Sequence, residues 1–171
     1  MNKNLCLCLA FLALAFTASA AQPAAPYQGS PEFERMKSLV GSWKGTHDMG
    51  QGPMEMTVEY RLVAGGSALE ERFLAGTPME MVTMYHDRKG KLALTHYCML
   101  HNQPGMILKS STPTTLSFDF DKTSGVDKNS MHMHSLVINF QDADHIMQDW
   151  KLYENGKPKD SHPIALKRVK S

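Results

Sequence analysis

A histidine and a cysteine near the middle of the sequence have the residue types and spacing that could do chemistry. His96 and Cys98 alternate along the chain with Leu92 and Leu94, so on a β-strand all four lie on one face. An imidazole and a thiol that face the apolar interior of a sheet can orient a ligand, bind a metal ion or form an activated nucleophile. The same spacing also fits a hydrogen-bonded core histidine beside a cysteine that behaves as a small buried hydrophobic residue.

Methionines are a second group of possible ligands. Pairs of methionines two residues apart recur in three places, Met54 and Met56, Met79 and Met81, and Met131 and Met133, and Met84 follows the second pair. Thioethers select Cu(I), and His132 and His134 have the same spacing and can add imidazoles. Methionine also fills irregular gaps in an apolar cavity. Because apolar alternation alone accounts for Met54 and Met56, we expect no stoichiometric copper.

The strand expected at 131–140 has two candidate inward faces. Leu136, Ile138 and Phe140 continue the face of the two histidines, whereas Val137 continues the face of the two methionines. The alternation therefore does not decide which of these side chains point into the protein.

A pair of acidic residues is the remaining chemical feature. Glu70 and Glu71 are adjacent, so on a strand they point to opposite faces and cannot form a paired-carboxylate site by themselves. An inward Glu71, beside Leu69 and Phe73, could pair with Arg168 at one end of a barrel, as a structural ion pair or as an anchor for a fatty-acid headgroup. The sequence has no Gly-x-Ser-x-Gly, His-Glu-x-x-His or phosphate-loop motif, and we expect a binding protein rather than an enzyme.

The N-terminal segment predicts export. Lys3 precedes an apolar run from Leu5 to Phe16, and Ala18-Ser19-Ala20 fits a signal-peptidase site. The run is too short to span a membrane, so we expect residues 1–20 to be a signal peptide, residues 21–30 a linker, and a periplasmic or secreted protein with no integral membrane segment. The remaining chain has 17 basic and 17 acidic residues, a balance that argues against nucleic acid as a partner.

Residues 31–171 have the pattern of a single all-β domain. Ser30-Pro31 is typical of a helix start, and we expect a short helix over Pro31–Ser38 that lies across a barrel mouth. Beyond it the hydrophobic period is two, with turn residues at near-regular spacing. The expected strands, about ten, are 39–46, 54–62, 68–74, 79–86, 92–99, 106–110, 115–120, 131–140, 145–153 and 162–169. This pattern favours a closed antiparallel barrel.

The first of these strands contains Gly41-x-Trp43-x-Gly45, with a tryptophan large enough to plug one end of a small barrel. Together with the strands that follow, this motif resembles the calycin barrels, which include lipocalins, fatty-acid-binding proteins and haem-binding nitrobindins. The segments 81–86, 94–98 and 102–106 resemble more closely an uncharacterised bacterial family of secreted calycin-like barrels. The resemblance implies a ten-stranded barrel with an internal cavity and does not imply a ligand.

The nitrobindin resemblance adds one candidate ligand to a metal. His162 shares a face with Ile164 and Leu166 on the last expected strand, and the segment 162–168 is similar to the place where nitrobindins carry the histidine that binds haem, although Pro163 departs from that pattern. An imidazole facing an apolar cavity suits haem iron. The alternative is a solvated histidine at the barrel rim.

These features predict a secreted barrel that binds a small, largely apolar molecule and needs no cofactor. We expect the body of the ligand to contact Met54, Met56, Tyr60 and Leu94, and its polar group to contact His96, with Cys98 beside it. The alternatives are a haem-binding or copper-binding envelope protein, and a structural barrel whose core is filled.

Overall fold

The computed structural model describes residues 25–48 and 52–170 of the chain. The expected signal peptide and the first part of the expected linker lie outside the described residues. The described elements are α1 (Pro31–Lys37), β1 (Gly41–Asp48), β2 (Pro53–Val63), the short 3₁₀ turn η1 (Ala64–Gly66), β3 (Ala68–Phe73), β4 (Met81–Arg88), β5 (Lys91–Tyr97), β6 (Gly105–Ser111), β7 (Thr115–Phe120), β8 (His132–Phe140), β9 (His145–Glu154) and β10 (Lys157–Arg168).

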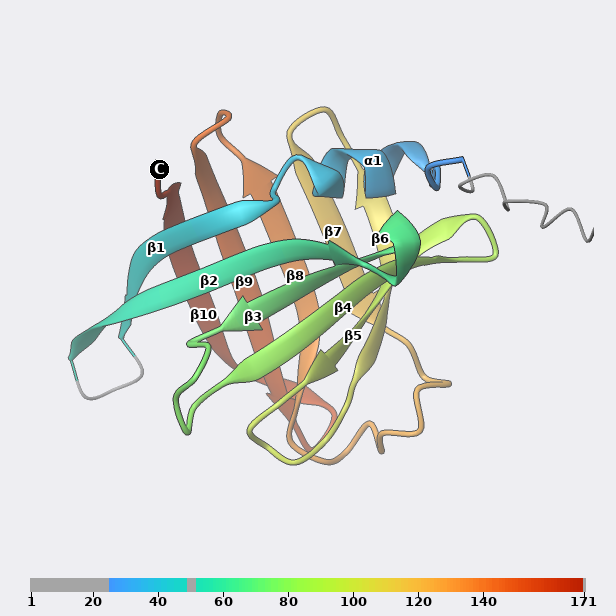
Figure 1. Ribbon diagram of the computed structural model, residues 1–171. Helices are drawn as coiled ribbons and strands as arrows, with labels where there is room; N and C mark the ends of the chain where they lie inside the picture. Colours follow the sequence, from blue (N-terminus) through green and yellow to red (C-terminus); the bar gives the residue numbers. More distant parts are fainter. Residues whose placement is uncertain (1–24, 49–51, 171) are drawn as a thin grey trace, which may run out of the picture.

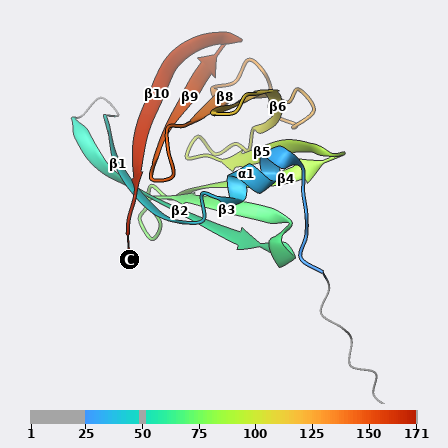
Figure 2. The ribbon, with the colours of Figure 1, turned by 90° about the horizontal axis from the view of Figure 1, so that it is seen from above.

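The ten strands form one closed barrel in which each strand pairs with its neighbours in the sequence (Figures 1 and 2). Every pairing is antiparallel, and β10 closes the barrel against β1. The predicted all-β barrel with a short N-terminal helix is confirmed. Closure removes the free sheet edges that an open meander of this length would expose.

Alternating side chains fill the barrel, as the period of two predicts. On β2, Met56, Val58 and Tyr60 are buried, and the residues between them are exposed. The same alternation holds on β3, where Leu69, Glu71 and Phe73 are the buried side chains. One face of each strand is therefore solvated while the other forms the core.

The helix α1 covers one mouth of the barrel (Figure 2). Ser30 caps it by accepting a hydrogen bond from the backbone N–H of Phe33, and Pro31 occupies the first helical position. Phe33 and Met36 are completely buried beneath the helix. Asp87, at the end of β4, accepts hydrogen bonds from the backbone N–H and the hydroxyl of Ser30, at 2.6 and 2.7 Å. These two bonds fix the start of the helix to the barrel.

The Gly-x-Trp-x-Gly motif closes the barrel on the side of α1. Trp43 is 1% exposed, donates from its ring N–H to the carbonyl of Leu39 at 2.8 Å, and lies under the guanidinium of Arg168. A Cβ atom on Gly45 would lie 2.0 Å from the carbonyl oxygen of Ala165 on β10. Glycine at this position therefore allows β1 and β10 to approach closely enough to pair.

The strand β10 begins at Lys157, earlier than the start at His162 that the sequence predicts. Pro158 and Pro163 argue against a strand here, because proline has no N–H to donate to a ladder. Nevertheless β10 pairs with β9 from Lys157 onward, whereas its pairing with β1 covers only the residues from Ala165 to Arg168. Among the described residues, the first half of β10 is therefore paired on one side only, and proline is tolerated on its other side.

The strand β8 presents both of its candidate faces inward, at different heights. Its pairing with β9 shifts register between Met133 and Ser135, a bulge that reverses the alternation. Leu136 and Ile138 are therefore buried in the core beyond the bulge, while Met133 faces the interior before it. Within the described residues, no helix is long and apolar enough to cross a membrane.

Candidate functional site

A cavity of about 80 Å³ lies inside the barrel, near the end opposite α1. Its wall is almost entirely carbon and sulfur, with three imidazole rings among the lining side chains. The lining residues are His47, Met56, Phe73, Met81, His96, Met133, Trp150, His162 and Ile164. They come from eight of the ten strands, so the fold rather than any local motif assembles the site.

The residues that the sequence assigns to ligand binding have separate locations. His96 and Met56 line the cavity, and so does His162, the residue that the nitrobindin resemblance points to. Tyr60 and Leu94 are buried in the core outside the cavity lining. The remaining two predicted residues also lie outside the cavity lining. Met54 is partly buried at the edge of the core, and Cys98 lies just beyond the end of β5.

Cys98 belongs to a turn rather than to the cavity wall. Its backbone N–H donates to the carbonyl of Asn102 at 3.1 Å, and its carbonyl accepts from the N–H of His101 at 3.0 Å. The side chain is half-buried, and burial raises the pKa of the thiol. A raised pKa leaves little thiolate at neutral pH, which does not suit a nucleophile.

A row of polar side chains crosses the barrel wall beside the cavity. The strand register aligns Tyr60 with Glu71, Glu71 with Thr83, and Thr83 with His96. All four side chains are buried. The row therefore links a carboxylate in the core to an imidazole in the cavity wall.

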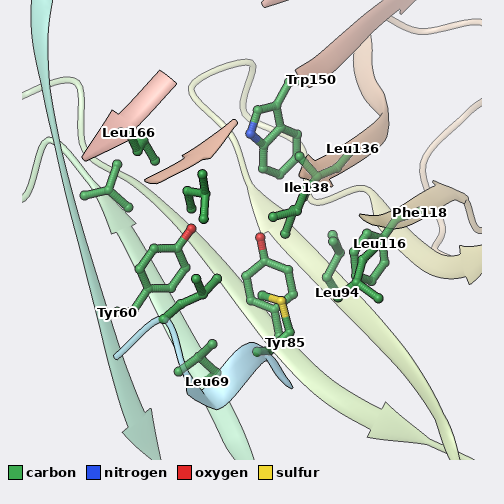
Figure 3. Close-up of a cluster of buried hydrophobic side chains, with 14 of the residues drawn as sticks. Tyr60, Leu69, Tyr85, Leu94, Leu116, Phe118, Leu136, Ile138, Trp150 and Leu166 are labelled. Carbon is green, nitrogen blue, oxygen red and sulfur yellow. The ribbon is translucent and has the colours of Figure 1, made fainter. Parts of the chain in front are cut away.

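Glu71 is completely buried and faces inward, but its partners are neutral groups. Its carboxylate accepts hydrogen bonds from the hydroxyls of Tyr60 and Tyr85 and from the side-chain amide of Gln148. Figure 3 shows the two tyrosine hydroxyls pointing into the same part of the barrel interior. Thr83 supplies a further hydrogen bond. Burial raises the pKa of Glu71, although each of these hydrogen bonds lowers it.

Arg168 does not form the ion pair with Glu71 that the sequence suggests. Its guanidinium donates to the carbonyls of Val40 and Ser38, at 2.8 and 2.7 Å, and lies over the ring of Trp43. It thereby ties the end of β10 to the segment after α1. Glu71 has no cationic partner among the described residues.

The polar row fixes which nitrogen of His96 carries the proton. The Thr83 hydroxyl has one proton, which it donates to Glu71, so it accepts from Nδ1–H of His96 at 2.9 Å. Nε2 of His96 then keeps a lone pair and has no hydrogen-bond partner in the described part of the chain. Burial lowers the pKa of His96 to about 4, and the ring is neutral at physiological pH.

A pair of imidazoles, His47 and His162, lies where β1 and β10 separate. Nδ1 of His47 is 3.2 Å from the carbonyl oxygen of Pro163, and Nε2 of His47 is 3.2 Å from Nδ1 of His162. A carbonyl only accepts, so His47 carries its proton on Nδ1, and in the neutral pair His162 donates from Nδ1 to His47. Nε2 of His162 then keeps a lone pair, on a ring that belongs to the cavity lining.

Trp150 joins opposite sides of the barrel beside the cavity. Its ring lies 4.7 Å from that of His96 and 6.4 Å from that of Phe73, centroid to centroid. Its ring N–H donates to Gln148 at 2.8 Å, and Gln148 in turn donates to Glu71. The N–H that Trp150 could offer to a ligand is therefore already used, and the unpartnered ring nitrogens of the cavity wall are acceptors.

This fold is shared with a solved protein. The crystal structure of Rv2717c from M. tuberculosis resembles this chain with a TM-score of 0.56 and 14% identity, over 84% of this chain and 100% of that one. At this level of identity the likeness shows the fold alone. The chain matches no protein-family model, and it matches none of the curated proteins with which it was compared.

Sequence reasoning missed several cavity residues. Phe73 and Trp150 lie on strands that the sequence predicts, but at a spacing that fits an ordinary core position. His47 lies one residue beyond the first predicted strand, on the part of β1 that the sequence does not predict. Met81 and Met133 belong to the methionine groups that the sequence singles out, although their meeting depends on the barrel register. Within the described ranges, no group of three or more His, Cys, Asp or Glu side chains is placed to hold a metal ion.

Proposed function

We propose that the protein is an exported, calycin-like barrel that binds a small, largely apolar molecule in the cavity. The observation that carries this proposal is an apolar cavity whose wall holds two imidazoles with fixed tautomers, His96 and His162. A pocket of this kind combines apolar burial with a few oriented polar groups. Export rests on the sequence of residues 1–20, and detection of a chain that begins at Ala21 in the periplasm or medium tests it.

The cavity limits the size and polarity of the ligand. Its volume of about 80 Å³ is below the roughly 150 Å³ of an engineered cavity that holds benzene. A single aromatic ring therefore fits only if the rim of the cavity moves. Because the free ring nitrogens are acceptors, a ligand with a hydrogen-bond donor fits and a carboxylate does not. A fatty-acid headgroup is disfavoured for this reason.

Three matched compounds test this proposal: toluene, phenol and benzoate. With ¹³C-labelled methionine methyl groups, toluene and phenol should shift the signals of Met56 and Met81 in a saturable way. Phenol should bind about fivefold more tightly, as one net hydrogen bond of ~1 kcal/mol implies, and benzoate should not bind. His96→Leu should keep toluene binding and lose the preference for phenol. Absence of a saturable shift with every compound would show that the cavity is filled or closed.

Haem is a second candidate, favoured by His162. Nε2 of this residue has no partner in the described part of the chain, and its Nδ1 is oriented by His47, an arrangement typical of histidines that bind metals. The donor therefore fits haem iron, whereas a cavity of about 80 Å³ does not fit a porphyrin, since pockets for larger ligands have roughly 300–1,000 Å³. Haem binding requires the barrel end to widen.

Addition of haemin to the purified protein tests this candidate. If His162 binds the iron, a Soret absorption band should form, and it should be lost in His162→Ala and kept in His145→Ala, an exposed histidine outside the cavity. A band that is equal in both variants indicates haem adsorbed to the surface.

A further inference from the structure

We propose that the cavity binds one Cu(I) ion through the thioethers of Met56, Met81 and Met133 together with the imidazole of His162. The proposal goes beyond the proposed function: it rests on the same cavity being a binding site, but its ligand is a soft metal ion rather than an apolar molecule. It reverses the expectation of no stoichiometric copper, which considered only the methionine pairs that lie along single strands.

The three thioethers come from three separate strands. Met56 lies on β2, Met81 on β4 and Met133 on β8, and all three side chains line the same cavity. Met133 reaches the interior only because of the bulge in β8. Met54 and Met79, the strand neighbours of the first two in the sequence pattern, are not among the lining residues. Apolar alternation along one strand does not account for a convergence of this kind.

Imidazole complements the thioethers. In the neutral His47–His162 pair, His162 donates from Nδ1 to His47, and His47 donates from Nδ1 to the carbonyl of Pro163. A hydrogen bond from the far nitrogen orients a metal-binding imidazole and strengthens it as a donor. Nε2 of His162 is therefore prepared to bind a cation rather than to donate a proton.

A buried carboxylate lies behind the opposite wall of the cavity. Nδ1–H of His96 donates to Thr83, and Thr83 donates to Glu71, which has no cationic partner among the described residues. A cation in an otherwise apolar cavity needs negative charge nearby to offset its desolvation. In its ionised form Glu71 supplies this charge through the hydrogen-bonded row, while the cavity surface itself remains apolar.

The donor set and the space favour Cu(I) over other cations. Soft thioether ligands select Cu(I), whereas Mg²⁺ and Ca²⁺ need oxygen ligands, and structural Zn²⁺ sites use thiolate, imidazole and carboxylate ligands. The cavity has room for a bare ion without movement of the rim. No electron transfer is involved, because the ion enters and remains in the reduced state.

An anaerobic titration with Cu(I), in competition with a coloured Cu(I) chelator, tests the proposal. The wild-type protein should withdraw one equivalent of Cu(I) from the chelator. Met81→Leu/Met133→Leu should bind Cu(I) at least tenfold more weakly, because it keeps side-chain volume but removes two sulfur donors. The matched control is Met106→Leu, a buried methionine outside the cavity lining, and its affinity should equal that of wild type. Zn²⁺ added in place of Cu(I) should bind more weakly.

Two results overturn the proposal: no withdrawal of Cu(I) by the wild-type protein, or equal loss of affinity in the cavity variant and the control. Circular dichroism of each variant shows whether loss of binding reflects loss of folding, and Met133→Leu alone provides a milder change if the double variant does not fold. Failure of the copper proposal can be distinguished from failure of the proposed function. If the cavity binds toluene but not Cu(I), only the copper proposal fails, and if it binds both, Cu(I) should displace toluene.

Discussion

Trp43 joins three separate parts of the protein: β2, the segment after α1, and the end of β10. Its ring contacts Tyr60 edge to face, its N–H reaches the carbonyl of Leu39, and Arg168 covers its face. Trp43→Ala should therefore reduce the free energy of unfolding by ~3–5 kcal/mol, the usual range for a large core aromatic. Urea unfolding measures this loss, and a loss below ~1 kcal/mol would mean that the ring contributes little to the closure of the barrel.

Glu71 gives a prediction about pH. Burial raises the pKa of its carboxyl above the ordinary value of 4.5 in the folded protein. From pH 4.5 up to the folded pKa, the folded state therefore holds a proton that the unfolded state has released. Stability contributed by this group is lost as the pH rises through that window, by about 1.4 kcal/mol for each unit of the raised pKa.

The comparison of wild type with Glu71→Gln measures this effect. The glutamine does not titrate. The free energy of unfolding of wild type should therefore fall relative to that of Glu71→Gln as the pH increases from 4.5. His96, whose pKa is lowered to about 4, acts in the opposite direction but is present in both proteins. A difference that does not change with pH would show that Glu71 titrates in the folded protein as it does in the unfolded chain.

Individual residues differ in how far the sequence predicts them. The inward direction of His96 and Glu71 follows from alternation, and the structure has both facing inward. The alternation also predicts that Cys98 faces inward, but β5 ends at Tyr97 and the chain turns, so Cys98 does not continue the inward face of the strand. The tautomers of His96 and His162 cannot be predicted from the sequence, since they depend on hydrogen bonds between residues brought together by the register.

At the scale of elements, the helix α1 depends on its attachment to β4. Asp87 accepts two hydrogen bonds from Ser30 and one from the hydroxyl of Tyr27. Asp87→Ala should therefore cost ~2 kcal/mol of stability, because the donors lose a charged acceptor. Hydrogen exchange should increase first in residues 31–37. Asp160→Ala, at an exposed position on β10, should change the stability by less than ~0.5 kcal/mol.

The sequence predicts the existence of every strand but not all of their boundaries. Periodicity identifies a strand wherever one face is buried and the other solvated, as on β2. It fails on β10, where two prolines occupy the unpaired side, and on β8, where the bulge reverses the alternation. Both exceptions arise from pairing with particular neighbours, and both occur at the cavity, where Met133 and His162 lie.

At the scale of the whole molecule, the two ends of the barrel differ. The end beneath α1 is filled by large side chains, including Tyr60 and Tyr85, whereas the opposite end retains the cavity. The total of apolar and aromatic residues does not predict this difference, because packing depends on how side chains from distant strands meet. The sequence therefore predicts a barrel with an interior but not which end of it stays open to a ligand.

The cavity of about 80 Å³ is a partly open void, and a protein with no use for this void would gain packing contacts by filling it. Ile164→Phe adds volume at a buried position in the cavity wall. It should raise the free energy of unfolding by up to ~1 kcal/mol and abolish binding of both toluene and Cu(I). Ile138→Phe is the control, because this side chain lies in the filled core and should destabilise the protein by ~1–3 kcal/mol through overpacking. Urea unfolding and the two titrations measure these effects. If Ile164→Phe is as destabilising as the control, or still binds either ligand, the void is not a site that the barrel preserves at the expense of stability.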